Sequence, residues 1–147
     1  MRFRFILGII AVLTIWVMPV RAQVSNTQVQ ALVEALRLAA PQTGTENDGL
    51  YSDWQIKPDN IPRWSKLCTG EEMTVQQFEA NIAKAREVLG CVMEDIFKEQ
   101  YAASANDEAL AVRRAAAWWM TGDPSQYNSG EIANYTDKVL SFYREQK

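Results

Sequence analysis

The residues best suited to chemistry lie between positions 46 and 64, in a stretch dense in aromatic and turn-forming residues. Trp54 and Gln55 are adjacent there, and an indole beside a primary amide is a common surface for a sugar. The ring packs on the apolar face of a pyranose, and the amide meets its hydroxyl groups. The alternative is a buried structural loop whose tryptophans belong to the core.

Cleavage of a glycan would need a carboxylic acid near that surface to protonate the leaving oxygen. Glu46 lies upstream of Gln55, beside a Thr-Gly-Thr turn, and can reach the same groove from its loop. It is the predicted catalytic residue; the alternative is an exposed loop carboxylate. Asp48 and Asp53 are candidates for a second carboxylate, and their alternative role is in forming turns or caps.

Short motifs along the chain resemble those of lysozyme-like lytic transglycosylase domains, above all the short variants of phage tails and secretion systems. Tyr51–Pro58, with Asn60–Ser65 after it, resembles their Gly-(Leu/Arg)-(Met/Tyr)-Gln-Ile-x-Pro turn. Met73–Phe78 is similar to Met-Thr-Pro-Glu-Glu-Phe, and Ala116–Pro124 to Ala-Ser-x-Trp-Phe-Thr-Gly-x-Pro. Tyr135–Leu140 resembles the closing Tyr-Val-x-Lys-Val-Leu helix, so the motifs occur in the family's order over most of the chain.

This resemblance implies a lysozyme-like, α-rich fold with a minimal hairpin or irregular loop near Trp54. It also implies an activity on the glycan strands of peptidoglycan, which the family cleaves with a single glutamate. The predicted substrate-binding residues are Tyr51, Trp54, Gln55 and Trp119. Of the neighbours Trp118 and Trp119, which point about 100° apart on a helix, we expect one in the core and Trp119 in the groove; both in the core is the alternative.

The chain departs from the family where the catalytic glutamate is expected, at the end of the first helix. That helix ends Leu38–Pro41 without a glutamate, and Glu34 lies more than a turn too early to face the same side. Glu46 is therefore the replacement acid in an enzyme, and a non-catalytic relative is the alternative.

The first residues, 1–22, are predicted to be a signal peptide. Two arginines precede the apolar run Phe5–Val17, and Val20–Ala22 fits a small-residue cleavage site before Gln23. The run is short for a membrane span, although an uncleaved anchor is the alternative. We therefore expect an exported protein, periplasmic or extracellular, that leaves the membrane after cleavage.

Residues 23–147 would then form a single domain. Without the three arginines of the signal segment, 12 basic residues face 18 acidic ones, a net charge of −6. This balance argues against nucleic acid as a partner. The chain has no histidine, which excludes histidine-based nucleophilic catalysis and makes transition-metal sites improbable. We expect no cofactor and no metal, a monomer, and peptidoglycan glycan strands as the partner.

Hydrophobic periodicity, capping residues and breakers predict an all-α fold and no strand pattern. The expected helices run from a cap at Ser25 or Asn26 to about Ala40, from a capping box at Thr74 to Glu79, from Ile82 to Ala103, from a cap at Asn106 to Thr121–Gly122, and from Asn128 or Ser129 toward the C-terminus. Pro58 and Pro62 exclude a continuous helix across the aromatic stretch.

The break between the second and third of these helices follows from Cys68 and Cys91. In an exported protein these cysteines predict a disulfide, with two free buried thiols as the alternative. A straight helix over Thr74–Tyr101 would carry Cys91 about 26 Å along the axis, whereas the segment after Cys68 reaches about 20 Å at most. We therefore expect a turn at Glu79–Asn81, because asparagine tolerates turn geometry.

Two main function classes follow. The first is a small lytic transglycosylase-like enzyme, and the second is a non-catalytic domain that binds peptidoglycan or an envelope protein. A third interpretation is a disulfide-stapled helical envelope domain whose resemblance is architectural only.

Overall fold

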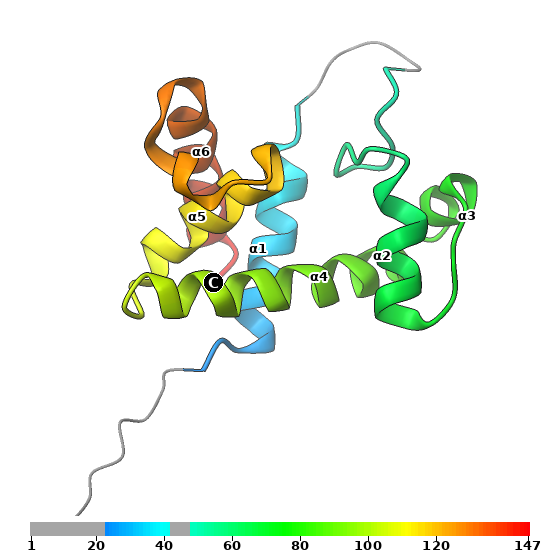
Figure 1. The fold of residues 1–147 in the computed structure, drawn as a ribbon, viewed down its shortest axis with the longest axis horizontal. Coiled ribbons are helices and arrows are strands. Elements are labelled where there is room, and N and C mark those ends of the chain that lie inside the picture. The colour runs from blue at the N-terminus through cyan, green and yellow to red at the C-terminus, as the bar shows by residue number, and fades with distance from the viewer. Residues whose placement is uncertain (1–22, 42–47) are drawn as a thin grey trace, which may run out of the picture.

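The computed structural model describes residues 23–41 and 48–147, and these residues are mainly helical (Figure 1). The predicted all-α fold is confirmed. In chain order the elements are α1 (Asn26–Ala39), α2 (Asn60–Thr69), α3 (Val75–Ala80), α4 (Ile82–Ala103), α5 (Glu108–Thr121), the 3₁₀ turn η1 (Pro124–Asn128) and α6 (Gly130–Glu145). The signal peptide predicted for residues 1–22 lies outside the described residues and stays a prediction.

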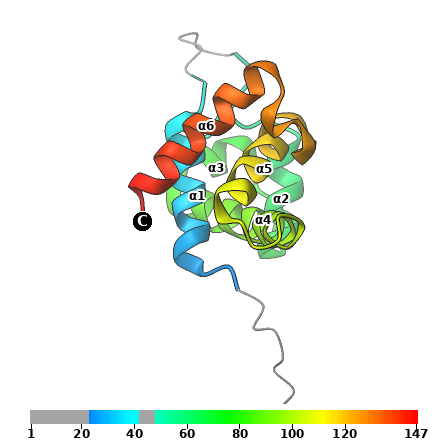
Figure 2. The ribbon, with the colours of Figure 1, turned by 90° about the vertical axis from the view of Figure 1, so that its left-hand side faces the viewer.

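Helix α4 is the spine of the molecule. Helices α1 and α5 each pack against α4 and against α6, and α2 and α3 pack against α4 near its N-terminal end (Figures 1 and 2). One hydrophobic core joins these helices, and its largest fully buried side chains include Leu32, Leu36, Ile61, Phe78, Leu89, Met93 and Phe97. No helix in the described part of the chain combines the length and apolar character that a membrane crossing requires.

Local capping sets most of the helix ends as predicted. Ser25 and Thr74 each begin a helix with a capping box, in which the glutamine three residues later closes back on the cap. The cap of α5 is a correction: the side chain of Asp107, not that of Asn106, accepts the hydrogen bond from the Leu110 backbone N–H. Asn106 has a positive φ of 65° and belongs to the preceding turn, where asparagine is tolerated.

A minimal hairpin precedes α2, as predicted. Tyr51 and Ile56 form an isolated antiparallel bridge, with backbone hydrogen bonds of 2.9 and 2.8 Å in the two directions. Ser52 and Gln55 within the turn have φ values of 63° and 54°, in the left-handed region that costs energy for non-glycine residues. The Gln55 side chain offsets part of that cost because its Nε2 donates to the Ser52 carbonyl at 3.1 Å.

Helix α2 was not predicted, since the two prolines obscured it. Pro58 precedes the helix, and Pro62 lies in its first turn, where the missing N–H has no partner to lose. The helix ends at Gly70, which takes the left-handed conformation with φ 79°.

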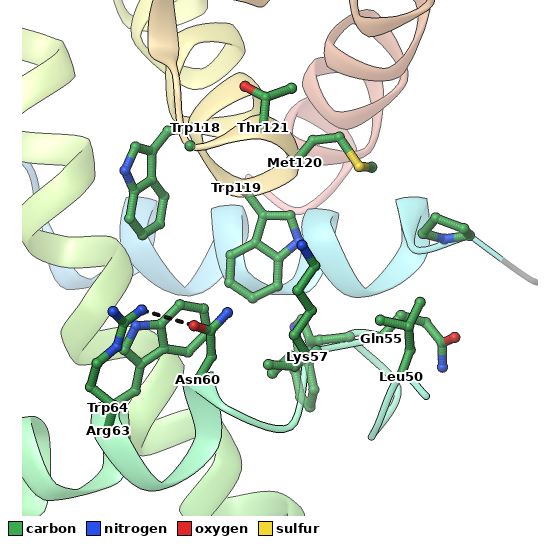
Figure 3. Close-up of a pocket in the computed structure, with 14 residues that line it drawn as sticks. Leu50, Gln55, Lys57, Asn60, Arg63, Trp64, Trp118, Trp119, Met120 and Thr121 are labelled. Atoms are coloured by element: carbon green, nitrogen blue, oxygen red, sulfur yellow. Dashed lines mark hydrogen bonds between the residues drawn. The ribbon is translucent and has the colours of Figure 1, made fainter. Parts of the chain in front are cut away.

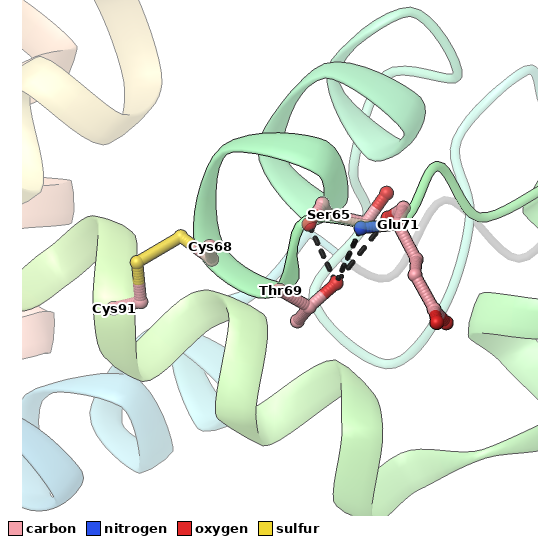
Figure 4. Close-up of a disulfide and its surroundings, with 5 residues drawn as sticks. All are labelled: Ser65, Cys68, Thr69, Glu71 and Cys91. Atoms are coloured by element: carbon pink, nitrogen blue, oxygen red, sulfur yellow. Dashed lines mark hydrogen bonds between the residues drawn. A yellow bond between two sulfur atoms is a disulfide. The ribbon is translucent and has the colours of Figure 1, made fainter.

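The predicted Cys68–Cys91 disulfide is confirmed, with an S–S distance of 2.05 Å and Cα atoms 5.9 Å apart (Figure 4). The predicted helix break is confirmed as well, because α3 ends at Ala80 and Asn81 caps α4 by accepting from the Lys84 N–H at 3.0 Å. At the end of α2, Thr69 Oγ1 donates to the Ser65 carbonyl at 2.7 Å and accepts from the Glu71 N–H at 3.3 Å (Figure 4). The Cys68–Cys91 disulfide therefore fastens α2 to α4.

Replacing both cysteines by serine tests this fastening. We expect Cys68→Ser/Cys91→Ser to lower the free energy of unfolding by about 3 kcal/mol, since the cross-link closes a loop of sequence separation 23. Urea unfolding measures the loss. Dithiothreitol should lower the stability of the parent protein and leave the double variant unchanged; an equal response of both proteins would contradict the argument.

Candidate functional site

A cleft of about 430 Å³ opens between α2, the C-terminal end of α5 and the hairpin loop (Figure 3). Its volume lies within the ~300–1,000 Å³ typical of small-molecule sites. The lining residues are Pro41, Leu50, Trp54, Gln55, Ile56, Lys57, Asn60, Arg63, Trp64, Trp118, Trp119, Met120, Thr121 and Gly122. The cleft is therefore built from two parts of the chain that lie far apart in the sequence: Pro41 with the hairpin and the start of α2, and the C-terminal end of α5.

Three indoles dominate its walls. The Trp64 ring of α2 lies 6.5 Å from Trp118 and 5.7 Å from Trp119 of α5, measured between centroids, with interplanar angles of 29° and 34°. All three side chains are half-buried, so their rings support one another and still present surface to the cleft. Flat apolar surfaces of this kind suit the faces of pyranose rings.

The two tryptophans of α5 differ from the expectation. We expected one in the core, but both are half-buried and both line the cleft. Both tryptophans belong to the last turn of α5, which ends at Thr121, and each packs one side against the core and leaves part of its surface exposed. Trp119 lines the cleft, and its role in binding a substrate stays a prediction.

Trp54 also differs in its role. The structure brings it to the cleft with Gln55 and Trp119, but its side chain is only 1% exposed, so it forms the floor and offers no free face for stacking. Its Nε1 donates to the Val33 carbonyl of α1 at 2.8 Å, and the Arg86 guanidinium lies 5.2 Å from the ring centroid.

Polar groups lie beside the indoles. Gln55 is half-buried at one side, and Asn60 and Arg63 lie on the α2 side, where Arg63 Nη2 donates to Asn60 Oδ1 at 2.8 Å (Figure 3). Asn60, Arg63 and Trp64 are three and four residues apart and so share one face of the helix. Tyr51, the remaining predicted binding residue, is half-buried in the hairpin and does not line the cleft.

Behind the hairpin, Glu34 joins α1 to α4. Its carboxylate accepts from Arg37 Nε at 3.0 Å and from Arg86 Nη2 at 2.6 Å. The hydrogen bond from Arg37, with that from Arg86, holds the pKa of Glu34 below its ordinary value of 4.5, although partial burial works in the opposite direction. A general acid needs a raised pKa, so Glu34 is a structural anion.

Among the described residues, none of the carboxylates proposed for catalysis lines the cleft. Asp48 Oδ1 accepts from the Leu50 N–H at 2.9 Å and forms a turn. Asp53 lies 3.7 Å from Arg37 and is well exposed, with 59% of its side chain accessible. Glu46 lies outside the described residues, so its predicted catalytic role stays a prediction.

The residues of the cleft that the sequence reasoning did not assign to it include Lys57, Asn60, Arg63 and Trp64. A helix beginning at Asn60 would have put three of them on one face, and the signal for it was the proline at its third position, which is compatible with a first turn. No family model, curated protein or solved structure matches this chain.

Glu34→Gln should lower the free energy of unfolding at pH 7 by about 1–3 kcal/mol, because it leaves two half-buried arginines without their anion. Since the pKa of Glu34 is lowered by folding, its stabilising effect is complete above pH 4.5 and is lost as the pH falls through the folded-state pKa. The variant should therefore lose less stability than the parent on acidification, measured by urea unfolding between neutral and acidic pH.

Glu87→Gln is the matched control, since Glu87 pairs with Lys84 on the surface and 56% of its side chain is exposed. We expect it to change stability by less than about 0.5 kcal/mol. A Glu34 variant as stable as this control at pH 7 would contradict the structural role.

Proposed function

We propose that this protein is exported and binds the glycan strands of peptidoglycan in the cleft between α2, α5 and the hairpin. The observation that carries the proposal is the cluster of Trp64, Trp118 and Trp119 around one cleft of about 430 Å³. Amide side chains at Gln55 and Asn60 lie beside these rings and supply donors and acceptors for sugar hydroxyl groups. The disulfide fits an oxidising compartment.

The same lining favours binding over cleavage. Within the described residues, the cleft contains no aspartate or glutamate, whereas protonation of a glycosidic oxygen requires a carboxylic acid beside the bond. The ordered motifs shared with lytic transglycosylase domains fit a retained sugar groove with or without that acid. We therefore infer a glycan-binding relative of such enzymes.

The enzyme remains the second candidate because residues on both sides of Glu46 in the sequence line the cleft. Pro41 and Leu50 flank Glu46 in the sequence, and both line the cleft. A glutamate between them would supply the missing acid.

Trp119→Ala should weaken binding to peptidoglycan about tenfold or more, because it removes one wall of the aromatic cluster. The measurement is a pull-down of the chain from residue 23 on insoluble peptidoglycan, followed by titration with soluble fragments. Gln55→Ala should weaken binding by a smaller factor, since it removes an amide and no stacking surface.

Leu67→Ala is the matched control for these variants. Leu67 is 73% exposed on α2, outside the cleft, so its loss should leave binding within about twofold of the parent. Circular dichroism confirms that each variant is folded. Binding by Trp119→Ala equal to that by Leu67→Ala would contradict the assignment of the cleft, and absence of binding by the parent would favour a protein partner.

Glu46→Gln separates the enzyme from the binding module. If the protein cleaves glycan, the amide keeps the size of the side chain but cannot donate the proton, so lysis should be lost and folding kept. Zymography on purified cell wall, with analysis for anhydro-sugar ends, measures this. Lysis by the parent and by Glu46→Gln alike would remove Glu46 from the mechanism.

A further inference from the structure

The cleft concentrates positive charge on an acidic protein. The whole chain has a formal net charge of −3, yet the described lining holds two cations, Lys57 and Arg63, and no carboxylate. Of the ten other lysines and arginines in the described part of the chain, six form an ion pair with a carboxylate. The paired ones are Arg37 and Arg86 with Glu34, Lys84 with Glu87, Lys98 with Glu94, Arg113 with Asp137, and Lys147 with Glu108.

Arg63 reaches the cleft from α2. Its Nη2 donates to Asn60 Oδ1 at 2.8 Å, one turn earlier on α2, and this bond fixes the guanidinium beside Trp64 at the cleft (Figure 3). It makes no ion pair with any described carboxylate. The remaining N–H groups of the planar fork can bind a carboxylate in two parallel hydrogen bonds.

Lys57 supplies a second charge from a different segment. It follows the bridge residue Ile56 in the hairpin, and its side chain extends toward Trp119 in the view of Figure 3. It too makes no ion pair with a described carboxylate. Two cations and an aromatic cluster line the same cleft, so the lining suits a ligand that is both flat-faced and negatively charged.

We propose that Arg63 and Lys57 form an anion subsite of the cleft, so that it selects amino-sugar strands bearing carboxylate groups over neutral strands. This inference rests on the proposed glycan-binding function and adds its specificity. The rings hold the apolar face of a sugar, while the cations bind a carboxylate on a substituent of that sugar or its neighbour. The carboxylate can belong to an ether-linked acid on the sugar or to a peptide attached to it.

Three ligands of equal sugar length test the inference. They are a neutral N-acetylglucosamine oligomer, a peptide-free peptidoglycan oligosaccharide with its lactyl carboxylates, and the same oligosaccharide with its peptides. Quenching of tryptophan fluorescence in the chain from residue 23 reports binding. We expect both acidic ligands to bind about tenfold more tightly than the neutral one at low salt, or only the peptide-bearing ligand if the peptide supplies the carboxylate. The preference should fall as salt is raised.

Arg63→Gln and Lys57→Gln should bring the ratio of acidic to neutral affinity toward one, and Arg63→Lys should keep part of it. Lys66→Gln is the matched control, because Lys66 is an exposed cation of α2 outside the cleft lining, and it should leave the ratio within about twofold of the parent.

Equal affinity of the parent for all three ligands would overturn the anion subsite and leave the proposed function standing. A preference that survives in both glutamine variants would overturn the assignment to Arg63 and Lys57. Absence of binding to every ligand would overturn the proposed function and the inference together.

Discussion

The burial of Trp54 is the interaction on which the arrangement of the cleft depends. Its indole, 1% exposed, donates to the Val33 carbonyl of α1 and lies under the Arg86 guanidinium of α4. Glu34 accepts from Arg86 and so holds the charge above the ring. A short loop with two positive φ values has little stability of its own, so this anchor between two helices fixes the hairpin. The contacts of Trp54 thereby also fix the positions of Gln55 and Lys57, its neighbours in the hairpin, at the cleft.

The opposite walls depend on α4. Helix α2 is fastened near the N-terminal part of the spine by the Cys68–Cys91 bond, while α5 packs against the spine through an alanine-rich face whose small side chains permit close approach. The cleft lies between α2 and the C-terminal end of α5. The stretch of α4 between Cys91 and the residues that pack against α5 therefore sets the position of Trp64 relative to Trp119.

The features that could be predicted from the sequence are those governed by local chemistry or by chain length. Capping residues predicted α1 and α3, and the reach of the chain between the cysteines predicted the break before α4. The errors arose where tertiary context decides. Pro62 hid α2 because its effect depends on whether it occupies a first turn or an interior turn. The sequence could not show that Trp54 is buried while Trp64 is only half-buried. Both lie in the same aromatic, turn-rich stretch, and what distinguishes Trp54 is its packing against α1.

The charges of the cleft distinguish the two candidate functions, binding and cleavage, better than its aromatic residues do. An acid catalyst must keep its proton near neutral pH, which requires burial or a neighbouring anion that raises its pKa. The described cleft provides the opposite environment, because Lys57 and Arg63 would lower the pKa of any carboxyl group brought beside them. The same two charges stabilise a carboxylate that arrives on a ligand. A cleft of this charge therefore suits an anionic glycan as a bound partner better than it suits a proton donor acting on that glycan.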